Sequence, residues 1–294
     1  MHYHECSKIM NVNVAVSQFK SIKEDKEANI NKALYLAGEA SKQKVNILLL
    51  QELFQSEYFC STQDEKFFDY AIEFPNNKLF ETFSNFCKSH NMVIPVSFFE
   101  KKDRNFFNSL VLINSDGKLS ELYRKSHIPE GPGYNEKFYF EPGDTGFKVF
   151  KTKFGNIGCG ICWDQWFPEC ARSMTLSGAD ILLFPTAIGS EPQDPLLDSK
   201  DHWQNVMRGH AAANQIPVIA SNRIGTEVEG SISVTFYGSS FIANHLGNIE
   251  IEMNKEEEGF VYKNFNFSEI AKYRQSWGNF RDRRPDLYKN ICDF

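Results

Sequence analysis

Nearly continuous apolar runs, separated by amphipathic stretches, constrain the fold of this chain more than any other feature. The runs VNILLL (45–50) and ADILLFP (179–185) are typical of strands buried on both faces of a sheet. Residues 24–43 instead carry their apolar side chains at helical spacing. This alternation predicts an α/β fold in which helices cover sheets.

The same alternation continues along the chain. Further strands and hairpins are expected at 12–19, 92–100, 106–125, 147–162, 216–225 and 233–253 (two strands). Further helices are expected at 78–90, 168–177 and 200–214. Because no linker, repeat or low-complexity segment interrupts the pattern, we expect one domain across 1–294, with residues 1–10 as a mobile N-terminus.

Charge and cysteine content narrow the class of protein. The 294 residues carry a net charge of −6, whereas non-specific nucleic-acid binding needs a basic face. No segment approaches the ~18 apolar residues of a membrane helix, and the N-terminus lacks the apolar run of a signal peptide. The seven cysteines are odd in number and mostly lie within apolar patterns. We therefore expect a cytoplasmic protein with reduced thiols and with no nucleic-acid or membrane partner.

Two of the cysteines stand three residues apart in GCGICWDQWFPE (158–169). A structural zinc site needs four ligands, but no second pair accompanies these cysteines, and His202 and His210 are eight residues apart. The first cysteine of a redox pair usually lies at a helix N-terminus, whereas Cys159 lies inside an apolar strand pattern. We expect no metal site, and we interpret Cys159 as a buried core thiol.

Cys162 differs because it ends the apolar run and precedes Pro168, where a helix can begin. Open α/β folds place ligand and catalytic groups where buried strands feed into helices. A nucleophile at such a turn can use backbone N–H groups as an oxyanion hole. The plain alternative is a small apolar residue that ends a strand, and this stretch alone does not decide between the two.

Two other strand ends carry charged residues. Glu52 follows the run at 45–50, and Lys125 follows the strand before a loop rich in Pro and Gly. Each has a plain alternative as a solvated residue just past a strand. Together they would give Cys162 a base for its proton and a cation that favours a thiolate, without a histidine. His210 is interpreted as a packing residue.

The chain resembles the nitrilase, or carbon–nitrogen hydrolase, superfamily in three motifs: QELF (51–54), YRKSHIP (123–129) and CGICWDQWFPE (159–169). Their order and spacing match across nearly the whole chain. The resemblance implies an α/β fold built as a four-layer α-β-β-α sandwich, which usually pairs into dimers or higher homo-oligomers. It also implies a second catalytic glutamate, Glu136, which would position Lys125 and the substrate.

Within the superfamily the chain is most similar to the branch that hydrolyses N-carbamoylputrescine, through HIPEGPGYNEKFYFEPGDTGFKVF (127–150), PTAIGSEPQDP (185–195), 198–225 and RDRRPDLY (281–288). This likeness implies a cationic small-molecule ureido substrate, a cysteine thioester, and no metal or organic cofactor. One departure is Glu130, where that branch has Asp.

The residues that would hold the substrate are less well defined. A diamine tail needs a carboxylate and apolar walls, for which Glu191 is the first candidate and Glu130 the second. Tyr58, Trp163 and Trp166 are candidates for the walls, although tryptophans also pack in cores. Glu191 and Asp194 could equally be solvated loop residues.

Other activities stay open at the level of sequence. An N-carbamoyl amino acid would need a cation facing its carboxylate, and Arg172, Arg208 and Arg223 could supply one. The alternatives are therefore an N-carbamoyl-amino-acid or β-ureidopropionate hydrolase, or an ω-amidase. From a different class, a non-catalytic binding member that keeps the fold is opposed by the intact Glu52, Lys125 and Cys162.

Overall fold

The computed structural model describes residues 11–292, so the N-terminal segment expected to be mobile lies outside the described residues. The first sheet is built from two three-stranded parts, in the orders β14-β1-β2 and β3-β4-β5. A parallel bridge between Ile47 and Val93 joins the two parts. The strands are β1 (Asn11–Gln18), β2 (Ile47–Leu49), β3 (Ile94–Lys102), β4 (Asn105–Ile113), β5 (Leu119–Arg124) and β14 (Gly259–Asn266).

The second sheet has six strands in the order β13-β12-β9-β8-β7-β6. Its inner strands β7, β8 and β9 are parallel, and antiparallel neighbours flank them. The strands are β6 (Lys148–Thr152), β7 (Gly155–Cys159), β8 (Ile181–Pro185), β9 (Val218–Ser221), β12 (Phe241–Ala243) and β13 (Ile249–Glu252). A separate hairpin pairs β10 (Ile224–Glu229) with β11 (Ile232–Tyr237).

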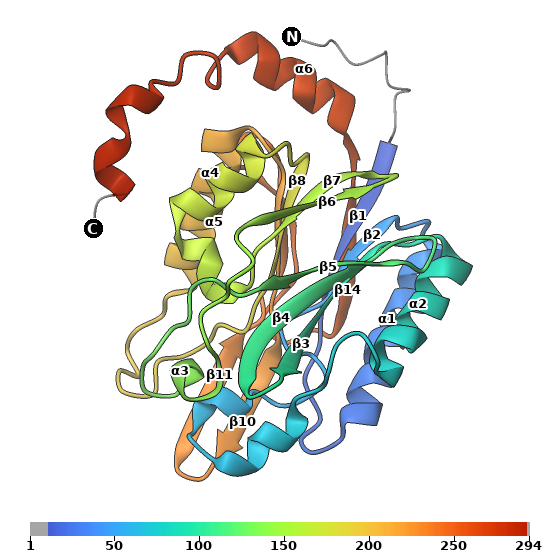
Figure 1. The fold of residues 1–294 in the computed structure, drawn as a ribbon, viewed down its shortest axis with the longest axis vertical. Helices are drawn as coiled ribbons and strands as arrows, with labels where there is room; N and C mark the ends of the chain where they lie inside the picture. Colours follow the sequence, from blue (N-terminus) through green and yellow to red (C-terminus); the bar gives the residue numbers. More distant parts are fainter. Residues whose placement is uncertain (1–10, 293–294) are drawn as a thin grey trace.

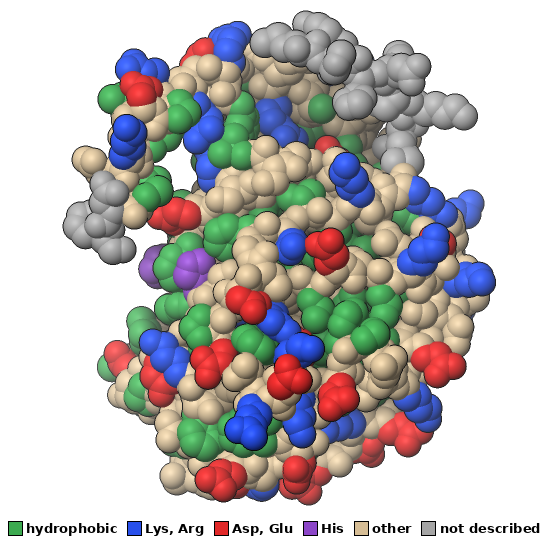
Figure 2. Space-filling model, in the orientation of Figure 1, with side chains coloured by type: hydrophobic (Ala, Val, Ile, Leu, Met, Phe, Trp, Pro, Cys, Tyr) green, Lys and Arg blue, Asp and Glu red, His purple; other side chains and the backbone are tan. Residues whose placement is uncertain are grey.

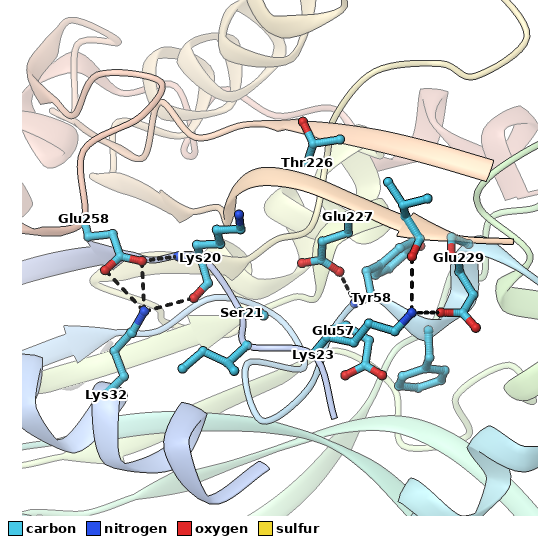
Figure 3. Close-up of a pocket in the computed structure, with 14 residues that line it drawn as sticks. Lys20, Ser21, Lys23, Lys32, Glu57, Tyr58, Thr226, Glu227, Glu229 and Glu258 are labelled. Carbon is cyan, nitrogen blue, oxygen red and sulfur yellow. Dashed lines mark hydrogen bonds and ion pairs between the residues drawn. The ribbon is translucent and has the colours of Figure 1, made fainter. Parts of the chain in front are cut away.

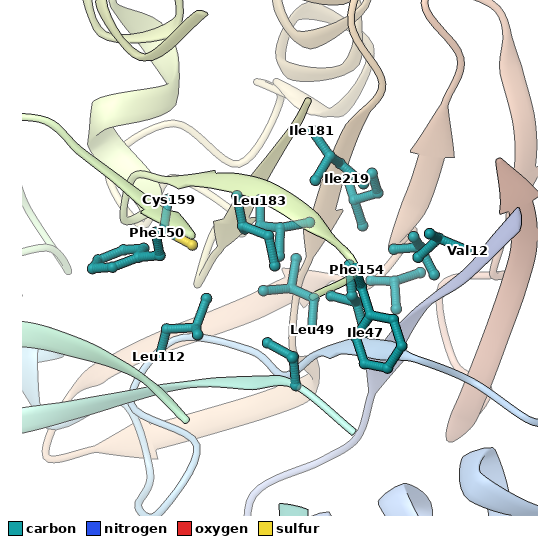
Figure 4. Packing of buried hydrophobic residues seen from close by; sticks show 14 of the residues in the cluster. Val12, Ile47, Leu49, Leu112, Phe150, Phe154, Cys159, Ile181, Leu183 and Ile219 are labelled. Carbon is teal, nitrogen blue, oxygen red and sulfur yellow. The ribbon is translucent and has the colours of Figure 1, made fainter. Parts of the chain in front are cut away.

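Apolar side chains of both sheets meet in a common core. Val12, Val14 and Val16 of β1 belong to the same buried cluster as Ile181 and Ile219 of the second sheet (Figure 4). Ala15, which alternates with the valines, packs in a different cluster with helix α1. Alternating side chains of β1 are thus buried on both faces, which explains its nearly continuous apolar run.

Helices cover the outer face of each sheet, α1 (Lys26–Lys42) and α2 (Lys78–His90) on one side, α4 (Pro168–Leu176) and α5 (Lys200–Asn214) on the other (Figure 1). The cap residues Asp25 and Asn77 accept backbone N–H groups at the starts of α1 and α2. Two more helices, α3 (Glu136–Tyr139) and α6 (Phe267–Trp277), lie outside these layers. The expected four-layer α-β-β-α order is therefore confirmed.

Two expected strand segments were wrong in detail. Residues 216–225 form two strands, because Asn222 bonds the backbone of Ile188 and Gly238 and ends β9 at Ser221. Residues 233–253 form three strands, because Gly238 and Ser239 adopt positive φ and break the run. Strand β14 has no counterpart among the sequence-based expectations.

The surface carries charges of both signs. On the face shown in Figure 2, Lys and Arg side chains are interspersed with Asp and Glu side chains. Among residues 11–292, no helix has the length and apolar character needed to span a bilayer.

Candidate active site

Three strand ends bring Glu52, Lys125 and Cys162 together. Glu52 lies three residues beyond β2, Lys125 directly follows β5, and Cys162 lies three residues beyond β7. The exposed fraction of each residue is 0%, 0% and 6%, respectively. Because these strands belong to both sheets, the site forms only when the whole sandwich is assembled.

The Lys125 ammonium bridges two buried carboxylates. Its Nζ lies 2.9 Å from Glu52 Oε1 and 2.5 Å from Glu136 Oε2. Burial by itself lowers the pKa of Lys125, but Glu136 and Glu52 outweigh it and hold that pKa well above its usual value. Lys125 is therefore a permanent cation at the centre of the site.

The two carboxylates differ in the oxygens that remain free. Glu136 uses both oxygens, because Oε1 accepts the Tyr58 hydroxyl at 2.8 Å and Oε2 accepts Lys125. Glu52 accepts Lys125 and Asn108 through Oε1 alone. Its Oε2 is buried and has no hydrogen-bond partner among residues 11–292. Glu52 is thus the carboxylate with an oxygen able to receive a proton.

Cys162 sits in a strained turn, with φ of 43° in the left-handed region. This conformation costs about 1–2 kcal/mol for a residue with a Cβ. Asp164 holds the turn, because its Oδ2 accepts the N–H of Ile161 at 2.9 Å and the hydroxyl of Tyr123 at 2.6 Å. Its Oδ1 accepts the N–H of His127 at 3.0 Å. The nucleophile turn is therefore tied to the segment that carries Lys125.

The sulfur of Cys162 is a thiol at rest. Burial first, then the negative charge of Glu52, raises the pKa of Cys162 well above its usual value, although Lys125 lowers it. The thiol donates a long hydrogen bond to Ala187 O at 3.7 Å. The cation was expected to favour a thiolate, but burial and the carboxylates outweigh one ammonium. The proton must therefore leave during the attack rather than before it.

We expect kcat/KM to fall as the pH is lowered through about 7. Burial raises the pKa of Glu136 to about 7, so in the folded protein this carboxylate takes up a proton below that pH. A neutral Glu136 would hold Lys125 less firmly. Ammonia release measured from about pH 5 to about pH 9 shows whether kcat/KM falls on the acid side of the pH profile. A kcat/KM that stays constant below about pH 7 would contradict this description of Glu136.

A cavity of about 480 Å³ opens onto Cys162. Four of the five sequence-predicted substrate residues line it, namely Glu130, Glu191, Trp163 and Trp166. The catalytic Glu136 also lines it, and its other walls are mainly apolar or neutral, from Pro129, Gly131, Pro132, Tyr134, Ala187, Ile188, Gln193 and Ser199. Among the described lining residues, His202 is the one basic side chain and no Lys or Arg is present.

Tyr58, expected to line the cavity, is absent from its lining and bonds Glu136 instead. Its hydroxyl donates to Glu136 Oε1 at 2.8 Å. Its backbone N–H donates to Glu227 at 2.6 Å, as Figure 3 shows. It borders a second cavity of about 520 Å³, where ion pairs join Lys23 to Glu229 and Lys32 to Glu258. Tyr58 thus supports the catalytic carboxylate rather than contacting the substrate.

The three arginines considered as carboxylate partners lie outside the lining of this cavity. Arg223 is fully buried and donates to the backbone oxygens of Glu52 and Leu53 at 2.8 and 3.3 Å. Arg208 bonds Gly247 O, and Arg172 bonds Ala213 O. His210 bonds the backbone of Gln165 at 2.8 Å, and Cys159 packs in the core between the sheets.

Three contributors were missed at the level of sequence: Asn108, Tyr134 and Asp164. Asn108 interrupts the apolar run of β4, and such a polar residue in a buried strand is the one signal that could have found it. Tyr134 lines the cavity, and its hydroxyl accepts Gly189 N–H at 3.0 Å. Among residues 11–292, no group of three or more His, Cys, Asp and Glu side chains is arranged to hold a metal ion.

Comparison with known proteins identifies close relatives. The family model described as carbon-nitrogen hydrolase matches residues 13–275. The chain is 53% identical over 282 residues to the N-carbamoylputrescine amidase of Oryza sativa subsp. japonica, covering 95% of this chain and 93% of that one. It is 48% identical over 281 residues to the citrullinase of Francisella tularensis subsp. tularensis, covering 96% and 98%.

Solved structures agree with the sequence comparison. The crystal structure of a carbon-nitrogen hydrolase from Helicobacter pylori G27 superposes with a TM-score of 0.91 at 36% identity, covering 97% of this chain and 99% of that one.

Proposed function

The chain belongs to the carbon–nitrogen hydrolase family, and from that premise we propose that it hydrolyses N-carbamoylputrescine to putrescine, ammonia and CO2. The diamine product would place the reaction in polyamine biosynthesis. The observation that carries the proposal is a cavity over Cys162 that contains Glu130 and Glu191 and, among the described lining residues, no Lys or Arg. Such a lining suits a substrate tail that ends in an ammonium group.

In the first half of the reaction, the Cys162 sulfur attacks the ureido carbonyl carbon while its proton passes to Glu52 Oε2. The carbonyl oxygen becomes an oxyanion. Lys125 and the N–H of Trp163, in the first turn after the nucleophile, are the donors that would stabilise it. Each donor of this type is typically worth roughly 3–4 kcal/mol. Glu52 then returns its proton to the terminal nitrogen, which leaves as ammonia.

In the second half, water attacks the remaining thioester-type intermediate. Glu52 takes a proton from this water, and the sulfur leaves and is reprotonated. The released carbamate of putrescine loses CO2 and leaves the free diamine. Glu136 keeps Lys125 in place throughout, because both of its oxygens are occupied by Lys125 and Tyr58.

A second candidate substrate is citrulline, which carries the same ureido group and adds an α-amino and an α-carboxylate group. The 48% identical relative named citrullinase favours it. Its carboxylate would need a cation, and the described lining offers only His202 beside Glu130 and Glu191. We therefore place N-carbamoylputrescine first.

Glu191→Gln is expected to raise KM for N-carbamoylputrescine by about 10- to 100-fold and to change kcat less. The reason is that a charge-assisted hydrogen bond to the substrate ammonium is worth about 1.5–3 kcal/mol. Steady-state ammonia release measures both constants. Asp194→Asn is the matched control, because Asp194 lies in the same loop, is exposed, and is absent from the cavity lining.

If Glu130→Gln raises KM and Glu191→Gln does not, Glu130 is the carboxylate that holds the ammonium. If neither substitution changes KM, recognition of the tail by a carboxylate is disproved.

We also propose a cytoplasmic location and a homodimer or higher homo-oligomer. The location is supported by the six cysteines of the described range, which are all unpaired, as expected in a reducing compartment.

A further inference from the structure

Asn108 contacts the catalytic base from outside the substrate cavity. It lies on β4, is fully buried, and its Nδ2 donates to Glu52 Oε1 at 2.7 Å. It is absent from the lining of the cavity over Cys162. Its backbone oxygen also accepts the N–H of Lys125 at 2.8 Å, a bond that a side-chain substitution retains, so an effect of the Asn108 side chain is expected to act through Glu52.

The hydrogen bonds of Glu52 are unevenly divided between its two oxygens. Oε1 accepts two donors, Asn108 at 2.7 Å and Lys125 at 2.9 Å. A carboxylate oxygen has about two lone-pair sites, so these donors occupy Oε1 and set the plane of the group. Oε2 is left buried without a partner within the described range. A buried acceptor without a donor is costly, and a proton from the thiol would relieve that cost.

The amide of Asn108 can face Glu52 in only one orientation. If its Oδ1 pointed at Oε1, two acceptors would meet at hydrogen-bond distance. With the nitrogen toward Glu52, Oδ1 has no partner among residues 11–292. The side chain thus leaves one of its own polar atoms unsatisfied while it bonds the carboxylate, which a purely structural asparagine would not be expected to do.

We propose that Asn108 is a positioning residue that holds Glu52 through Oε1 and so assigns the proton of Cys162 to Oε2. The proposal rests on Glu52 acting as the base of the proposed function. Other titratable or charged groups also lie around Glu52, namely Tyr58, Cys60, Lys125, Glu136, Cys162 and Arg223. The pH response is accordingly a property of the group as a whole.

The test measures alkylation of Cys162 by iodoacetamide as a function of pH, followed by mass spectrometry, in the full chain. This readout needs no hydrolysis and so separates the role of Asn108 from the identity of the substrate. Asn108→Ala is expected to slow alkylation by about 10-fold or more, since small misplacements of a catalytic group have effects of this size. The midpoint of its pH profile should rise, because a hydrogen bond to the charged carboxylate is lost.

Asn108→Asp preserves the shape of the side chain and guards against a variant that fails to fold. It puts a second carboxylate against Glu52, so the midpoint should rise by about 1 unit or more. The matched control is Ser109→Ala, on the same strand and also fully buried, whose hydroxyl bonds Glu100 at 2.5 Å instead of Glu52. It should leave the alkylation profile unchanged.

The proposal is overturned if Asn108→Ala and Asn108→Asp react like the parent protein, or if Ser109→Ala slows alkylation as strongly as Asn108→Ala. If the protein proves not to hydrolyse N-carbamoylputrescine, these outcomes still test the role of Asn108, because alkylation depends only on the thiol and its base.

Discussion

Cys162→Ala is expected to abolish ammonia release and to leave the fold and the thermal midpoint nearly unchanged. The variant removes the one atom that forms the covalent intermediate, so a loss on the order of 10⁴-fold or more is expected. Stability should change little, since the sulfur makes a single long hydrogen bond, to Ala187 O at 3.7 Å. Ammonia release and thermal unfolding of the same sample measure the two effects.

Cys159→Ala is the matched control for this prediction. Cys159 is three residues away and fully buried in the core between the sheets. Its replacement should lower stability by roughly 0.5–3 kcal/mol, as core changes usually do, and should keep most of the activity. Substantial activity in Cys162→Ala together with loss of activity in Cys159→Ala would show that the nucleophile is misassigned.

Lys125→Ala should abolish activity and also destabilise the protein, unlike Cys162→Ala. It removes the oxyanion donor and leaves Glu52 and Glu136 buried without their shared cation. Breaking a buried ion pair in this way typically costs about 3–5 kcal/mol. The same change at Lys148, which pairs with the exposed Glu121, should cost less than about 1 kcal/mol.

The destabilisation of Lys125→Ala should also depend on pH. Without the cation, the pKa of Glu136 in the folded state rises further above its unfolded value. The protonated form of Glu136 is therefore favoured by folding, so the variant is closest to the parent at low pH and loses stability as the pH rises. Urea unfolding at about pH 5 and about pH 8 tests this, and an equal loss at both values would contradict the shared-cation arrangement.

The sequence predicted most of the strands and helices well because burial leaves a direct trace in the apolar pattern, whereas the four-layer order was implied by the resemblance. The alternation of Val12, Val14 and Val16 with Ala15 marks a strand buried on both faces. The errors fall where a local backbone change overrides the pattern. Asn222 ends β9 through side-chain bonds to residues 16 and 34 positions away, and no local signal shows such bonds.

The site was predicted to the extent that its residues stand at strand ends. Glu52, Lys125 and Cys162 are visible there as polar or reactive residues attached to apolar runs. Asn108 was not, because its importance comes from Glu52, which lies 56 positions away in the chain. The residue types of Arg223 and Tyr58 suggested substrate contacts. Both side chains are buried, and they bond the catalytic glutamates instead: Arg223 donates to the backbone oxygen of Glu52, and Tyr58 donates to the carboxylate of Glu136.

The most direct test is kcat/KM for N-carbamoylputrescine beside citrulline and N-carbamoyl-β-alanine, measured by ammonia release with Cys162→Ala as the blank. We expect N-carbamoylputrescine to be preferred by about 10²-fold or more, because a substrate carboxylate placed near Glu130 and Glu191 would lack a full cation. A preference for citrulline or N-carbamoyl-β-alanine would contradict the cationic tail, while the chemistry at Cys162 would stand.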